Sequence, residues 1–99
     1  MGKEIETFVF CENMISTGSS NIYAIGDADV IYISFNCTGS FECSIQGRNV
    51  LYDDWKTILY TKASTYVQKI DLDEWSYVRV NINSIEGSLS CYGRAVEKH

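Results

Sequence analysis

Apolar and polar residues alternate along most of this chain with a period of two. In residues 30–36 (VIYISFN), for example, Ile31, Ile33 and Phe35 all fall on one side. Successive side chains of a β-strand point to opposite faces, so this alternation is typical of strands that bury one face. The pattern predicts strands at 3–11, 21–25, 30–36, 40–46, 55–62 and 66–72, and a final pair within 75–96.

The final pair, residues 75–96, is the most regular stretch. Its first strand places Val78, Val80 and Ile82 on one face, and residues 84–87 then supply a turn. A short polar turn between two alternating strands indicates an antiparallel hairpin. Residues 30–36 and 40–46, separated by Thr38-Gly39, predict a second hairpin for the same reason.

These elements predict an all-β fold. Seven to eight short strands with polar turns and no helical period indicate an antiparallel β-sandwich of jelly-roll type. Residues 1–99 are expected to form a single β-sandwich domain. The first strand carries Lys3, Glu4 and Glu6, charges that discourage stray pairing if this strand lies at an edge.

Charge and length narrow the function classes. The net charge is −5, and the eight basic residues are scattered, so neither nucleic acid nor an anionic membrane is an expected partner. No apolar run approaches the ~20 residues of a membrane span. The N-terminus lacks the apolar segment of a signal peptide, so the chain is expected to be made in a reducing compartment.

The sequence offers little for catalysis. His99 is the only histidine, so no Ser-His or Cys-His pair is expected, and we predict no enzyme activity, no cofactor and no metal. Asp27 with Asp29, or residues 71–74 (DLDE), would offer oxygen ligands for calcium. Acidic residues at such positions more often make turns. Residues 36–38 (NCT) fit the N-glycosylation pattern, which we attribute to chance.

The four cysteines are Cys11, Cys37, Cys43 and Cys91. Their spacing does not fit a zinc site. We expect reduced, buried thiols that pack as small apolar groups, and the main alternative is a Cys37–Cys43 disulfide.

One predicted face is too aromatic for plain solvent exposure and too polar for a core. If the last two strands pair, it collects Trp75, Tyr77, Arg79, Tyr92 and Arg94. Trp, Tyr and Arg are enriched at binding hot spots, so we interpret this face as an interaction surface. The alternative is that Trp75 and Tyr77 complete the edge of the core, with Arg79 lying over them.

Two segments resemble known domains. Residues 47–58 (GRNVLYDDWKTI) and 75–94 (WSYVRVNINSIEGSLSCYGR) are similar to small β-sandwich domains of tailed-phage virion proteins. They also resemble galactose-binding-like jelly rolls of discoidin type, although Asp53-Asp54 stands where that family has Asp-Gly.

The phage resemblance implies a non-enzymatic virion component in capsid decoration, a head fibre, the neck or the tail. Such a protein would assemble in the host cytoplasm, as a homo-oligomer and with other virion proteins. A carbohydrate-binding module is the alternative. In that case Tyr52, Trp55 or Trp75 would stack on a glycan.

Overall fold

The fold is all-β, as the alternation predicts. The structure, a computed structural model, describes residues 3–25, 28–49, 54–62, 65–72 and 75–97. Over these residues it contains nine strands and no helix. The strands are β1 (Lys3–Met14), β2 (Gly18–Ser19), β3 (Tyr23–Ala24), β4 (Val30–Cys37), β5 (Ser40–Arg48), β6 (Lys56–Thr61), β7 (Thr65–Asp71), β8 (Tyr77–Glu86) and β9 (Leu89–Glu97).

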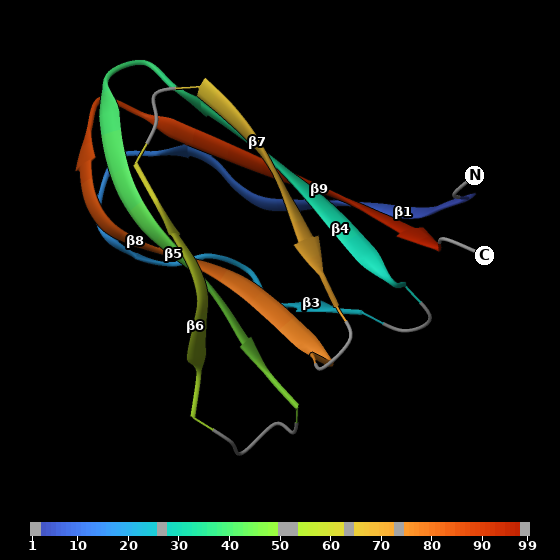
Figure 1. Ribbon diagram of the computed structural model, residues 1–99. Helices are drawn as coiled ribbons and strands as arrows, with labels where there is room; N and C mark the ends of the chain where they lie inside the picture. The colour runs from blue at the N-terminus through green and yellow to red at the C-terminus, as the bar shows by residue number, and fades with distance from the viewer. Residues whose placement is uncertain (1–2, 26–27, 50–53, 63–64, 73–74, 98–99) are drawn as a thin grey trace.

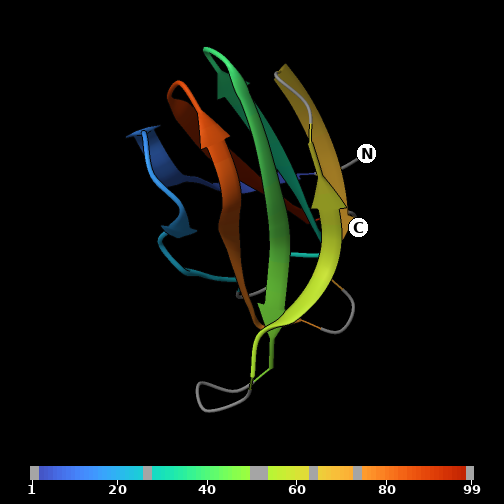
Figure 2. The same ribbon diagram turned by 90° about the vertical axis from the view of Figure 1, so that its left-hand side faces the viewer.

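The strands form two antiparallel sheets that pack face to face (Figure 1). The four-stranded sheet has the order β1-β9-β4-β7, and the five-stranded sheet has the order β2-β8-β5-β6, with β3 also paired to β8. Figure 2 looks onto the five-stranded sheet, where β8, β5 and β6 lie side by side.

This strand order confirms the predicted jelly roll. β2 and β3 pair with the same strand, at Gly18↔Ile82 and Tyr23↔Val78, so they act as one interrupted strand. Counted in this way, the order is that of an eight-stranded jelly roll built from two Greek keys. The sequence pattern identified the piece at Tyr23 but treated β2 as part of a loop.

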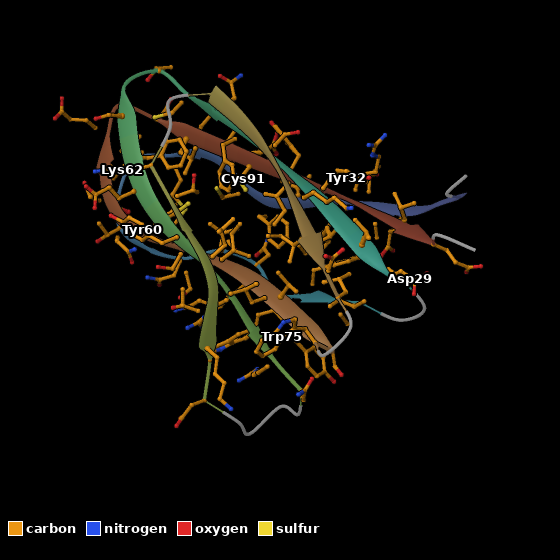
Figure 3. The ribbon with its side chains drawn as sticks, viewed as in Figure 1. Asp29, Tyr32, Tyr60, Lys62, Trp75 and Cys91 are labelled. Atoms are coloured by element: carbon orange, nitrogen blue, oxygen red, sulfur yellow. The ribbon has the colours of Figure 1, made fainter. Side chains whose placement is uncertain are left out.

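The core lies between the sheets and is filled by the inward residues of each alternating strand. Phe35 of β4 stacks on Phe41 of β5, with ring centroids 5.2 Å apart. Cys91 points into the space between the sheets and is fully buried (Figure 3). Val78, Val80 and Ile82 of β8 are likewise at most 1% exposed, as the alternation predicts.

Both predicted hairpins are wrong. β4 and β5 lie in different sheets, and so do β8 and β9. At 38–39 and again at 87–88 the chain crosses from one sheet to the other instead of folding back within a sheet. Alternation shows which side of a strand is buried, and two strands facing each other across a core have the same alternation as two hydrogen-bonded neighbours. The pattern therefore identified the faces but not the partners.

The cysteine prediction is confirmed. All four thiols are free and buried, and Cys37 and Cys43 form no disulfide. Burial raises the pKa of the Cys43 thiol to about 12, and burial also raises the pKa of Cys91. These thiols therefore stay protonated and apolar at neutral pH.

Candidate functional site

The five residues predicted to share one face do not lie together. Tyr77 and Arg79 belong to β8 and point outward from the five-stranded sheet. Tyr92 and Arg94 belong to β9 and point outward from the four-stranded sheet. Because β8 and β9 are in different sheets, the two pairs lie on opposite faces of the sandwich. The prediction of one shared face is wrong; a binding role for each pair stays a prediction.

Trp75 lies on neither outer face. An added Cβ at the inward-facing Gly47 would come within 2.7 Å of the Trp75 ring, and this ring packs at the edge of the core. β8 begins only at Tyr77, after a bend at Ser76, so the parity of the strand does not extend back to Trp75. For Trp75 the alternative interpretation, a residue that completes the core edge, matches the structure.

Tyr92 and Arg94 instead line a hollow on the outer face of the four-stranded sheet. Its volume is about 450 Å³, which falls within the ~300–1,000 Å³ typical of ligand pockets. The hollow is lined by residues of β1, β4 and β9: Thr7, Phe8, Val9, Tyr32, Ser34, Tyr92, Gly93 and Arg94.

The strand register assembles this hollow in two cross-strand rows. In one row, Arg94 lies opposite Thr7 on one side and Tyr32 on the other. In the next, Tyr92 lies between Val9 and Ser34. Since side chains at paired positions share a face, residues that are far apart in the sequence come into contact across β9.

The hollow combines apolar and polar groups. The Arg94 guanidinium lies 4.9 Å from the centre of the Tyr32 ring, a cation–π distance. The Tyr92 hydroxyl donates a hydrogen bond to Glu12 at 3.3 Å. Val9 and Tyr92 are 42% and 39% exposed, so apolar area of both side chains is open to a partner. Such a surface can bury aromatic area on a partner while its polar groups set the orientation.

The predicted sugar-stacking residues lie elsewhere. Trp75 is at the core edge, and Tyr52 lies outside the described residues. Trp55 is half-buried beside the five-stranded sheet, where the guanidinium groups of Arg48 and Arg79 lie over its ring.

Sequence reasoning missed Tyr32 and Arg48. Tyr32 carried a usable signal, because it is an outward aromatic residue on a strand whose other face is strongly apolar. Its nearness to Arg94 depends on the β4–β9 pairing, which the sequence pattern did not reveal.

Groups suited to metal binding do not converge in the described part of the chain. No cluster of three or more His, Cys, Asp or Glu side chains there is arranged to hold a metal ion. Of the acidic residues considered for calcium, Asp29 and Asp71 are described, whereas Asp27, Asp73 and Glu74 lie outside the described residues, as does His99. Over the same residues the structure has no helix long and apolar enough to cross a membrane.

Fold and site together define a jelly-roll sandwich with a hollow on one outer face. Two solved structures share this fold. The SPBc2 prophage-derived protein YomS has a TM-score of 0.83 and 14% identity, over 97% of this chain and 95% of that one. The PBSX exported protein XepA has a TM-score of 0.77 and 24% identity, over 96% of this chain and 38% of that one.

The likeness to both proteins concerns the fold. This chain spans 38% of the length of XepA, so it corresponds to one part of that protein. No protein-family model and no curated protein matches the sequence. The resemblance to galactose-binding-like domains therefore stays a prediction.

Proposed function

We propose that this protein is a non-enzymatic structural or interaction component of a bacteriophage particle. YomS, which shares the fold over nearly its whole length, is a prophage-derived protein. The phage-like segments of the sequence support the same assignment. Capsid decoration, a head fibre, the neck and the tail are all compatible with a small all-β domain of this kind.

The observation that carries the proposal is the hollow around Tyr92 and Arg94. A few residues contribute most of the energy of a protein interface, and Trp, Tyr and Arg are enriched among them. Here Tyr32, Tyr92 and Arg94 border a hollow of about 450 Å³, with the exposed Val9 beside them. The mechanism is burial of this surface against a second copy of the chain or another particle protein.

The proposed place of action is the virion, after assembly in the host cytoplasm. The buried free thiols suit folding in a reducing compartment. XepA, by contrast, is named as an exported protein. Cell fractionation during phage production would test whether this chain also leaves the cell before particles form.

The test compares matched tyrosines on the two outer faces. Tyr92→Ser changes the hollow, whereas Tyr60→Ser changes a tyrosine that is 50% exposed on the five-stranded sheet. Light scattering, with and without reductant, measures the mass of each variant, and pull-down measures its binding to phage particles. We expect Tyr92→Ser to weaken association at least about tenfold and Tyr60→Ser to leave it unchanged.

Three outcomes contradict the proposal. Equal effects of Tyr92→Ser and Tyr60→Ser on association would show that the hollow is not the interface. A wild-type protein that is monomeric and does not bind particles would exclude both kinds of partner. An oligomer that dissociates on adding reductant would show that cysteines, rather than the hollow, hold it together.

Glycan binding is the second candidate function. The hollow is a better candidate site for a glycan than Trp55 or Trp75. Tyr32 and Tyr92 offer aromatic faces beside the hydroxyls of Thr7 and Ser34. A glycan bound there would change the NMR signals of Tyr32 and Tyr92 but leave those of Trp55 and Trp75 unchanged. Particle binding that a soluble glycan does not inhibit would support the protein-interface function instead.

A further inference from the structure

Two arginines and a tryptophan form a compact cluster on the other outer face. The central guanidinium carbons of Arg48 and Arg79 lie 4.2 and 4.4 Å from the centre of the Trp55 ring. The Arg48 guanidinium also lies 6.0 Å from the Tyr77 ring. We call these residues the Arg48–Trp55–Arg79 cluster; all three are half-buried.

The register of the five-stranded sheet builds the cluster. Arg48, at the end of β5, pairs with Tyr77 of β8, and Gln46 pairs with Arg79. On the other side of β5, Gln46 pairs with Thr57 of β6, and Trp55 has the same strand parity as Thr57. The two arginines therefore converge from neighbouring strands, and Trp55 lies over both of them.

This arrangement concentrates positive charge in a protein of net charge −5. The pKa of Arg79 is lowered, first by burial and then by the nearby positive charge of Arg48. Trp55 offsets part of this repulsion through cation–π contact. Arg79 Nε donates a hydrogen bond to the neutral Gln46 side chain, at 2.8 Å from Oε1, and this contact brings no negative charge to the cluster.

Arg48 also leaves a polar atom without a partner. Within the described part of the chain, its Nε is buried and forms no hydrogen bond. A buried donor without an acceptor is costly, and such groups in folded proteins are commonly satisfied by a ligand or by water. Each guanidinium group carries a planar fork of donors that matches a two-oxygen anion.

We propose that the Arg48–Trp55–Arg79 cluster is a binding site for a carboxylate. The carboxylate accepts hydrogen bonds from both guanidinium groups and neutralises their mutual repulsion. Its source is an acidic side chain of a protein partner or a small carboxylic acid, which present the same group. A nucleic acid is disfavoured because two guanidinium groups contact few of the phosphates that a bound strand presents.

The test is an NMR titration of ¹⁵N-labelled protein. The probes are succinate, a hexaglutamate peptide and inorganic phosphate, each compared with sodium chloride at equal ionic strength. We expect both carboxylate probes, or the peptide alone, to give saturable shifts of the Arg48 and Arg79 Nε–H signals and of the Trp55 indole N–H. The indole signal of Trp75, at the core edge, should not move.

Matched variants separate a specific site from general charge attraction. Arg79→Gln and Lys62→Gln change the net charge equally, and Lys62 is an exposed residue just after β6. Arg79→Gln should weaken carboxylate binding about tenfold or more, since hydrogen bonds to charged groups are the strong ones. Lys62→Gln should change it less than about twofold. Arg79→Lys, which keeps the charge but loses the planar fork, is a second variant should Arg79→Gln not fold.

The titration distinguishes the two sources of the carboxylate and also tests whether the cluster is a carboxylate site. Binding of the peptide without succinate identifies an acidic protein segment as the ligand, and equal binding identifies a small carboxylic acid. No saturable shift with either carboxylate, saturable binding of phosphate alone, or equal loss in Arg79→Gln and Lys62→Gln would each overturn the proposal. The cluster and the hollow are on opposite faces, so Tyr92→Ser should leave this titration unchanged, and either proposal can fail independently.

Discussion

Thr38 and Ser88 are joined by two hydrogen bonds at the point where the chain twice crosses between the sheets. The Thr38 backbone N–H donates to the Ser88 carbonyl at 3.0 Å, and the Ser88 N–H donates to Thr38 Oγ1 at 2.9 Å. The Cys37 thiol donates to the Glu86 carbonyl at 3.7 Å, a weak contact beside them. The β4–β5 and β8–β9 connections are therefore fastened to each other, which holds the two sheets together at this end.

Replacing Thr38 by Val should lower the free energy of unfolding by about 1 kcal/mol, because the Ser88 N–H loses its acceptor while the shape is kept. Urea denaturation measures the change. Thr38→Ser is the control, since it retains the hydroxyl. Equal losses in Thr38→Ser and Thr38→Val would show that the hydrogen bond is not the cause.

Gly39 should not tolerate a side chain. An added Cβ would collide with the carbonyl group of Glu86, which is backbone and cannot rotate away. Gly87, in the facing connection, has a φ of +90°, so the two connections meet where neither has room for a Cβ. Gly39→Ala should cost about 1–3 kcal/mol of stability in thermal or urea unfolding. The neighbouring exposed Ser40→Ala should cost less than about 0.5 kcal/mol, and a neutral Gly39→Ala would contradict this packing.

Gly93 should be intolerant for a different reason, because it faces the core. A Cβ there would lie 2.7 Å from Cε2 of Phe10 and 3.1 Å from Cδ1 of Ile31. Gly93→Ala should destabilise the protein by about 1–3 kcal/mol. The double variant Gly93→Ala, Phe10→Leu should lose less stability than the sum of the two single losses, because the smaller leucine side chain relieves the clash. Strict additivity in a double-mutant cycle would contradict this contact.

Trp75→Ala should act on stability and not on association. The ring packs against the core beside Gly47, so its removal should cost about 2–4 kcal/mol, less than the loss for many fully buried tryptophans. Tyr77→Ala, two positions on and on the outer face, should cost less. Urea denaturation measures stability, and light scattering under folding conditions measures mass. A change in mass with unchanged stability would contradict this expectation and would indicate that Trp75 is an interface residue.

The buried thiols should make stability fall at alkaline pH. The pKa of Cys43 rises from 9.0 to about 12 on folding. As the pH rises, the thiol therefore loses its proton in the unfolded state first, and this deprotonation stabilises the unfolded state relative to the folded one. This stabilisation is fully present below pH 9 and is lost as the pH rises toward 12, at up to about 1.4 kcal/mol per pH unit for each such thiol. Tyr23, whose pKa is also raised to about 12, adds to the loss above its unfolded value of 10.0.

Urea midpoints at pH 8, 9 and 10 test this expectation in the range where thiols dominate. The fall between pH 9 and 10 should be smaller in Cys43→Ala than in the wild type, whatever the absolute stability of the variant. Equal pH slopes in the two proteins would exclude Cys43 as a cause.

The candidate surfaces show where sequence reasoning reached its limit. The sequence predicted a binding role for Tyr92 and Arg94, and the structure places the two residues on the same face of β9, two positions apart. Tyr32 and Arg48 were missed, because their partners come from other strands, whose pairing the sequence pattern does not reveal. Trp75 was assigned to the wrong face, since the bend at Ser76 breaks the alternation on which the assignment relied.

The sequence by itself determined the all-β class, the main strands and the inward faces of β4, β5, β8 and β9, because burial of apolar residues with a period of two depends only on local order along the chain. It also determined that the cysteines are core residues. Only the tertiary structure decided which strands pair. The same apolar residues are buried whether β4 and β5, or β8 and β9, lie in one sheet or in two. The arrangement therefore depends on long-range backbone hydrogen bonds and on the fit of the two connections at Thr38 and Ser88. That choice separates Arg79 from Arg94 and creates two candidate binding surfaces where the sequence predicted one.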